Sequence, residues 1–235
     1  MIVQNPSLTF GIELEFADIR TTFLRKHLPP GWECQGDNSI RNSDGSYSLF
    51  LNPSSLGTEV KTIGGFNLPD LIAQLPVIYG LVAERGGCVT KSCGLHVHVS
   101  FGSWTTDHLL SLATYFLEQP SFAEAVKCSK IRTKNQCSRV SEKMVRTIEK
   151  YKDEPELKTL KYLSAKIAHQ YVEFRQVEVN VLSLLHHGTI EYRAFNQTMD
   201  VQCAINCARY ADEVTRAALA GLPMPLPTYP LPRPL

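Results

Sequence analysis

Three short segments that alternate apolar with charged residues constrain the fold of this chain more than any other feature. They read FGIELEF at 10–16, GLHVHVS at 94–100 and TIEYRAF at 189–195. Successive side chains of a β-strand point to opposite faces, so apolar residues at alternate positions predict strands with one face in the core. The chain is therefore expected to form a sheet that is buried on one side, as is common for antiparallel strands.

The other face of these strands would carry charged or metal-binding side chains in pairs. The pairs are Glu13 with Glu15, His96 with His98, and Glu191 with Arg193. A solvated sheet face also carries polar residues, but more usually Lys, Thr and Ser. Neighbouring carboxylates repel one another unless a cation lies between them. The pattern therefore favours divalent ions such as Mg²⁺ or Mn²⁺, with neutral imidazole as an additional ligand.

Helical periodicity predicts helices at 69–85 and 106–118. Asp200 is expected to cap a further helix that ends at about Ala220, because Gly221 is suited to the position after a helix. These elements, together with the strands, predict an α+β fold in which a curved, mostly antiparallel sheet has helices on one face.

The other segments are expected to add short strands and loops. Residues 58–63 predict a short strand, and the Val- and Phe-rich residues 171–185 predict one strand or two. The density of Gly, Asn, Asp and Pro at 31–56 predicts loops and short hairpins. We expect one domain over residues 1–221, followed by a Pro-rich, extended tail at 222–235 that is dispensable unless it wraps the body.

Composition excludes several classes of protein. The 235 residues are 43% hydrophobic and 20% charged, which is ordinary for a globular protein and rules out wholesale disorder. Apolar stretches are far shorter than a membrane span requires, and the first residues do not resemble a signal peptide. We therefore expect a cytoplasmic protein without a membrane partner. Seven cysteines without a secretory signal indicate thiols or a metal site rather than a disulfide framework.

Positive charge is concentrated in residues 127–166, a basic segment that is expected to be a partly helical insertion. It holds twelve Lys or Arg against five acidic residues, although the net charge of the whole chain is only +1. Such a segment can attract phosphate-bearing ligands, but it is more often a solvated helical face. Aromatic residues do not alternate with the charges as a base-stacking surface requires, so no nucleic-acid partner is expected.

The ordered motifs resemble the glutamine synthetase/carboxylate–amine ligase superfamily, and most closely its shorter branch, the amidoligase-2 family. They are FG-x-E-x-E-F at 10–16, G-L-H-V-H-x-S at 94–100 and T-I-E-Y-R at 189–193, with Asp37-x-Ser39, Glu59-Val60 and Asn180 between them. The resemblance covers roughly residues 8–220. The chain is too short for the separate N-terminal domain of the larger synthetases and lacks their ammonia-site region, so free ammonia is not the expected amine.

The resemblance implies a role for each matching position. The implied metal ligands are Glu13, Glu15, Glu59, His96 and Glu191. His98, Ser100, Asn180 and Arg193 would contact the nucleotide, with Arg193 on the γ-phosphate. Arg193, Glu191 and Glu59 would be the catalytic residues.

The implied reaction is ATP-dependent amide formation through an acyl phosphate. The implied cofactors are ATP and Mg²⁺ or Mn²⁺, and the substrates are a small-molecule or peptide carboxylate and an amine. A carboxylate is a poor electrophile, and phosphorylation activates it for attack by an amine. Metal ions and an arginine can neutralise the charge on the phosphoryl group during transfer.

Other interpretations stay open at this level. Cys88, Cys93, His96 and His98 have the ligand types of a zinc site, and the His-x-His strand could serve a metal-dependent hydrolase. A third alternative is a catalytically inactive module that binds nucleotide or metal. Arg85 to Ser92 is the nearest segment to a Walker loop and lacks its glycines.

Single residues admit structural explanations as well. Asp37 and Ser39 are expected to shape a turn more than to contact substrate. For Arg132 and Arg139 a surface role is favoured over contact with ATP or an acidic substrate. Asn180 is either bonded to the backbone or a pocket group.

Overall fold

The computed structural model describes residues 7–46, 57–135, 137–151 and 176–235. Six strands form one sheet in the order β2-β3-β1-β4-β6-β5, and every neighbouring pair is antiparallel. The strands are β1 (Thr9–Phe16), β2 (Trp32–Gly36), β3 (Thr58–Thr62), β4 (Gly94–Ser100), β5 (Val179–Asn180) and β6 (Ile190–Asn196). The fold is therefore α+β with an antiparallel sheet, as predicted.

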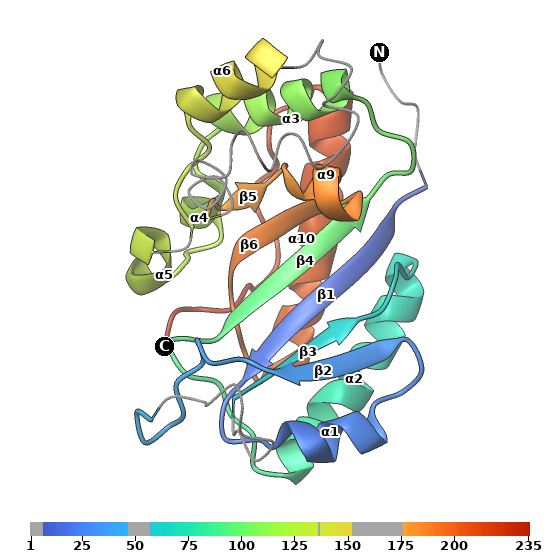
Figure 1. The fold of residues 1–235 in the computed structure, drawn as a ribbon, viewed down its shortest axis with the longest axis vertical. Helices are drawn as coiled ribbons and strands as arrows, with labels where there is room; N and C mark the ends of the chain where they lie inside the picture. The colour runs from blue at the N-terminus through green and yellow to red at the C-terminus, as the bar shows by residue number, and fades with distance from the viewer. Residues whose placement is uncertain (1–6, 47–56, 136, 152–175) are drawn as a thin grey trace.

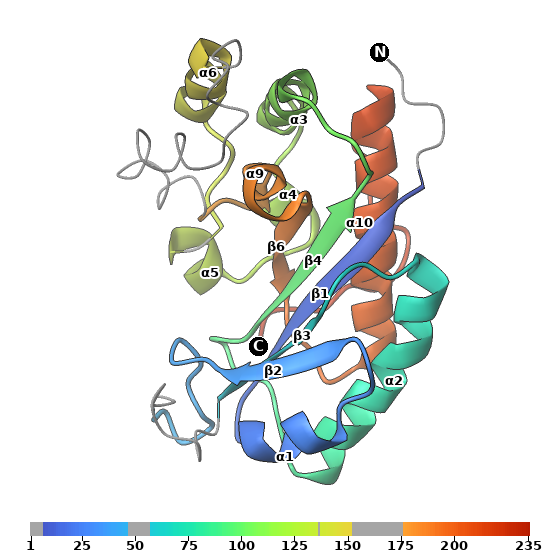
Figure 2. The ribbon, with the colours of Figure 1, turned by 45° about the vertical axis from the view of Figure 1, so that its right-hand side comes forward.

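Helices pack against the apolar face of the sheet. The two long ones, α2 (Leu68–Glu84) and α10 (Val201–Ala220), contact each other and the central strands β1 and β4. Figures 1 and 2 show both along one side of the sheet. The other helices are α1 (Thr21–His27), α3 (Thr106–Glu118), α4 (Phe122–Ala125), α5 (Lys130–Asn135), α6 (Glu142–Tyr151) and α9 (Ser183–His187).

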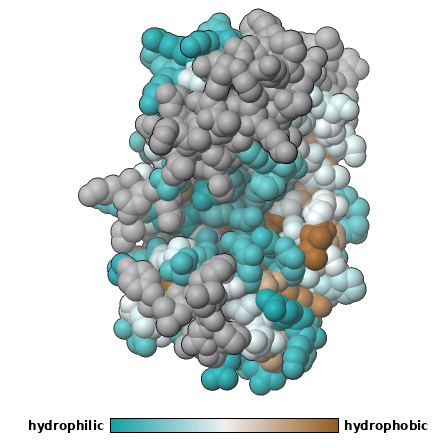
Figure 3. Space-filling view, in the orientation of Figure 1, coloured by the Kyte–Doolittle hydropathy of each residue, from teal (hydrophilic) through white to brown (hydrophobic). Residues whose placement is uncertain are grey.

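Alternation in the three motif strands builds the core. Their inward side chains are fully or almost fully buried, namely Ile12, Leu14, Phe16, Leu95, Val97, Val99, Ile190 and Tyr192. Burying each such side chain contributes roughly 1.5–3 kcal/mol to folding. The outward residues of the same strands then share the opposite face, which the space-filling view shows as a hydrophilic recess across the middle of the molecule (Figure 3).

Both ends of α10 carry the caps that the sequence predicts. The Asp200 carboxylate accepts the backbone N–H groups of Gln202 and Cys203, and Gly221 follows α10 with a φ of +65°. An acceptor at the N-cap satisfies amides that have no partner within the helix, and glycine adopts a positive φ without strain. These two signals therefore give the bounds of α10.

Parts of the secondary structure differ from the prediction. The segment 31–56 contains a full strand, β2, because Trp32 and Cys34 bury one face against β3 while Glu33 and Gln35 point outward. Within 176–185, the described part of the expected strand region, only Val179–Asn180 is a strand, and residues 183–187 form α9. The helix α1 is an element that the sequence pattern did not predict.

The Pro-rich tail is extended and packs on the body. Backbone carbonyls of Pro225, Pro230 and Pro232 accept hydrogen bonds from Tyr210, Asn206 and Asn196. The backbone N–H of Met224 donates to Gln119 at 3.0 Å. The tail therefore wraps the body, so the prediction that it is dispensable does not apply.

Residues 127–135 and 137–151, the described part of the expected basic insertion, include α5 and α6. Residues 152–166 of that segment lie outside the described residues. Among the helices that the structure describes, none combines the length and apolar character that a membrane span needs.

Candidate active site

The register of the central strands brings the paired polar residues together. Glu13 of β1 lies opposite His96 of β4, and His98 lies opposite Glu191 of β6. His96 Nδ1 is 2.9 Å from Glu13 Oε2, and His98 Nε2 is 3.4 Å from Glu13 Oε1. We call Glu13, His96, His98 and Glu191 the central cluster.

Glu191 is held from two sides. The Asn180 amide donates to Glu191 Oε2 at 2.8 Å, and the Arg193 guanidinium donates to Oε1. Both Asn180 and Glu191 are at most 5% exposed. The Asn180 side chain thus bonds to a carboxylate of the central cluster rather than to the backbone, and Arg193 is paired with the carboxylate two positions before it.

A second group of carboxylates, the edge cluster, consists of Glu15, Asp37 and Glu59. One oxygen from each lies within 4.8 Å of the others. Glu15 and Glu59 are cross-strand partners, and Asp37 follows β2. Glu15 Oε2 accepts the backbone N–H of Gly94 at 2.6 Å, and the Gln35 amide donates to Glu59 at 2.9 Å. Asp37 also accepts the backbone N–H of Ser39 at 2.7 Å, so it shapes the predicted turn and faces the edge cluster as well.

The pKa values of the central cluster show strong coupling. Burial raises the pKa of Glu13, but hydrogen bonds and charge interactions with His96 and His98 outweigh it and hold the pKa far below its ordinary value. Burial lowers the pKa of His96, and Arg193 adds to this, whereas Glu13 outweighs burial at His98 and raises its pKa. The two imidazoles therefore have pKa values shifted in opposite directions, a pattern common at functional sites.

Glu15 and Glu59 of the edge cluster have pKa values shifted upward, in contrast to Glu13. Burial raises the pKa of Glu15 to about 8, and Arg132 only partly offsets it. Burial and then Glu13 raise the pKa of Glu59. A bound cation would relieve both effects, because it favours the ionised form of a carboxylate.

Arg132 is buried beside the clusters, so the expectation of a surface position is wrong. It is only 3% exposed, and one guanidinium nitrogen lies 3.3 Å from His96 Nε2 and donates to the Arg193 carbonyl at 2.6 Å. A Cβ on Gly94 would come within 1.9 Å of Arg132 Nη1, so only glycine leaves room for it. The guanidinium thus lies over β4 next to both clusters.

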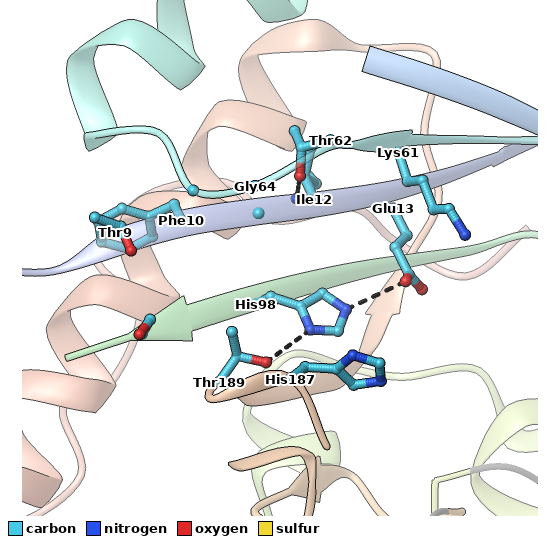
Figure 4. A pocket seen from close by; sticks show the side chains of 13 residues that line it. Thr9, Phe10, Ile12, Glu13, Lys61, Thr62, Gly64, His98, His187 and Thr189 are labelled. Atoms are coloured by element: carbon cyan, nitrogen blue, oxygen red, sulfur yellow. Dashed lines mark hydrogen bonds and ion pairs between the residues drawn. The ribbon is translucent and has the colours of Figure 1, made fainter. Parts of the chain in front are cut away.

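A pocket of about 440 Å³ adjoins the central cluster (Figure 4). His98 and Ser100, both predicted nucleotide contacts, line it together with Glu13. His98 Nδ1 shares a hydrogen bond of 3.1 Å with the Thr189 hydroxyl, which also lines the pocket. The predicted site residues thus lie in the two clusters or line the pocket, except Asn180 and Arg193, which bond to Glu191 of the central cluster.

Both clusters have the donor set of a divalent-cation site. Glu13, His96 and Glu191 each offer a ligand atom within 4.8 Å of the others, as do the three carboxylates of the edge cluster. Oxygen ligands with one imidazole suit Mg²⁺ or Mn²⁺. The residues present therefore fit the ions that the resemblance implies.

The zinc site considered from the sequence does not form. Cys93 packs with Ala17 and Ile40, beside Cys88, in a small separate core. The thiol of Cys88 contacts Asp18, whereas His96 and His98 contact Glu13. The four ligands of the suggested motif therefore do not converge.

A family model matches most of the chain. The family model described as "Putative amidoligase enzyme" matches residues 30–215, and a search of curated proteins finds no match. The matched range includes β3, β4 and β6 with Glu59, His96, His98, Glu191 and Arg193, and it begins after β1. Glu13 and Glu15 enter the site through the register of β1. Since the match covers more than half of the sequence, the chain belongs to the amidoligase family.

Proposed function

We propose that this protein is an ATP- and Mg²⁺-dependent carboxylate–amine ligase that forms an amide bond through an acyl phosphate. The observation that carries the proposal is the convergence of the central cluster, Arg193 and the adjoining pocket on one sheet face. Family membership supports amide ligation, and the ligand types support a metal-bound nucleotide.

Each group of side chains has a separate proposed role. Glu13, His96 and Glu191 would hold one divalent ion and the edge cluster another; such ions neutralise phosphate charge and orient the phosphoryl group when bound. Arg193 would contact the γ-phosphoryl oxygens. Its Nε is buried without a partner, so the guanidinium keeps a donor beyond those that Glu191 uses. Its planar fork suits two phosphate oxygens.

Bond changes in the reaction balance without any further reactant. A carboxylate oxygen of the substrate attacks the γ-phosphorus, and ADP leaves. The amine nitrogen then attacks the acyl carbon, phosphate leaves with that carboxylate oxygen, and the amine loses a proton. Glu59 and Glu191 are the proposed catalytic carboxylates. Each belongs to a cluster that would hold a divalent ion next to the transferred phosphoryl group.

Substrate pools test the proposal. The protein is incubated with ATP, Mg²⁺ and mixtures of carboxylates, amino acids and polyamines, and ADP and phosphate are measured. We expect release that requires both a carboxylate and an amine, falls by orders of magnitude in Glu13→Gln, and is unchanged in Glu118→Gln, an exposed control at the end of α3. Nucleotide binding without such release across broad pools would favour a binding module and contradict the ligase.

A further inference from the structure

Three glycines contribute main chain to the lining of the pocket. Gly11 of β1 and Gly64 and Gly65 of the turn after β3 line it. Gly64 has a φ of +86°, and a Cβ at Gly65 would come within 2.7 Å of Thr9 Oγ1. The turn therefore requires glycine, and a ligand can approach the main chain closely there.

Charge is unevenly distributed along this pocket. One end is lined by Glu13 and Lys61, and the other by Thr9 and Phe10 (Figure 4). Ser100, which also lines the pocket, is the cross-strand partner of Thr9 and so belongs to the second end. Lys61 is the single Lys or Arg among the described residues that line it. Thr9 and Glu13 are four residues apart on β1, about 13 Å at the usual rise per residue. The pocket therefore has one charged and one mostly uncharged end.

Lys61 is held only loosely where it lies. It is the cross-strand partner of both Glu13 and Glu33. Its Nζ is 3.5 Å from Glu59 and 3.7 Å from Glu33, longer than a normal hydrogen bond, and the side chain is 25% exposed. Partly exposed ion pairs of this kind contribute little to stability, and the lysine stem is flexible. The ammonium can therefore move toward a ligand at small cost.

A ligand anion would compete with Glu59 for this ammonium. Glu59 belongs to the edge cluster, so a divalent ion bound there would take over the neutralisation of its carboxylate. Lys61 would then be free to pair with a phosphate group at the charged end of the pocket. The lysine thus connects the edge cluster with the pocket.

We infer that Lys61 is a phosphate-positioning residue, and that the nucleotide lies with its phosphates at the Glu13 and Lys61 end and its nucleoside at the Thr9 and Ser100 end. The inference rests on the proposed function for the identity of the ligand. It does not rest on turnover, since a loosely paired ammonium beside a pocket partly lined by main chain suits any phosphate chain.

Binding measurements with three probes test it. Dissociation constants for ADP, inorganic tripolyphosphate and adenosine are measured by calorimetry, in EDTA and in Mg²⁺. The variants are Lys61→Met, Lys61→Arg and a matched control, Lys26→Met, at an exposed position on α1. Thermal unfolding of each variant shows whether it folds.

We expect Lys61→Met to weaken the binding of ADP and of tripolyphosphate by about tenfold or more and to leave the binding of adenosine unchanged. The dissociation constants of Lys61→Arg should stay within a few fold of the wild-type values. Those of Lys26→Met should equal the wild-type values. If a folded Lys61→Met binds tripolyphosphate and ADP as tightly as wild type does, the inference is overturned. Tripolyphosphate binding that needs Lys61, without any ADP binding, would support the phosphate contact and contradict the ATP-dependent ligase. No binding of any probe by wild type would overturn both.

Discussion

Glu15 is the residue at which burial and charge conflict most. The residue is 8% exposed, its carboxylate lies beside Asp37 and Glu59, and burial raises its pKa to about 8. The ordinary value is 4.5, so the folded protein binds this proton more tightly than the unfolded chain does. The stability that this provides is present below about pH 4.5 and is lost as the pH rises to about 8.

The change Glu15→Gln should remove this dependence, because glutamine can still accept the Gly94 N–H but does not ionise. In EDTA, the free energy of unfolding of wild type minus that of the variant should fall by roughly 3 kcal/mol between pH 5 and pH 8. Denaturant titrations at several pH values measure it, with Glu118→Gln as control. Parallel curves for wild type and Glu15→Gln would show that Glu15 ionises normally.

The substitution Arg193→Lys tests the proposed contact between Arg193 and the γ-phosphoryl group. Lysine keeps the charge but not the two-pronged donor, so Arg193→Lys should bind ATP within a few fold of wild type. Phosphoryl transfer should slow by about 10²-fold or more if the contact strengthens in the transition state. Binding and single-turnover transfer are measured separately. If Arg193 only neutralises Glu191, the rate at saturating ATP will stay within about threefold of wild type.

At the scale of elements, α5 reaches the site only because β4 begins with glycine. In Gly94→Ala the new Cβ would overlap Arg132, and the buried guanidinium must leave its position by His96. Hydrogen exchange should therefore increase in α5 while β1 stays protected. Gly80→Ala in α2 is the matched control, because nothing lies within 4 Å of its Cβ and alanine favours a helix. Unchanged exchange in α5 of Gly94→Ala would show that the guanidinium does not anchor this helix.

The tail is the second element whose role can be measured. Truncation after Gly221 removes the Pro230 carbonyl that accepts from the Asn206 amide and one of the two carbonyls that accept from the Asn196 amide, which keeps Lys127; the two residues are 3% and 5% exposed. An unsatisfied buried polar group costs roughly 1–3 kcal/mol, so we expect a clear fall in the free energy of unfolding. Truncation after Pro232 keeps these contacts and should change little. Equal stability of both truncations would mean that the tail contributes nothing.

Across the whole molecule, the sequence predicts those parts that a single strand or helix determines. The strands carrying Glu13, His96 and Glu191 follow from alternation, and the bounds of α10 follow from Asp200 and Gly221. The helix α9 was not separable from a strand, because Leu184 and Leu185 continue an apolar run after Val179 and Val181.

The arrangement of the site depended on tertiary structure. Which carboxylates form the central and edge clusters is decided by strand register, which is not visible in one sequence. Arg132 was expected at the surface and Lys61 was not singled out for the same reason, since each reaches the site through packing or pairing with segments far away in the chain. The residue types were predictable, whereas their grouping was not.

The most direct test of amide ligation through an acyl phosphate follows one oxygen atom. Once the pools identify a carboxylate substrate, it is labelled with ¹⁸O in the carboxyl group and supplied with ATP, Mg²⁺ and the amine. Mass spectrometry of the released phosphate should then show one ¹⁸O per phosphate, in step with ADP and amide. Unlabelled phosphate, or AMP and pyrophosphate in place of ADP, would contradict the account.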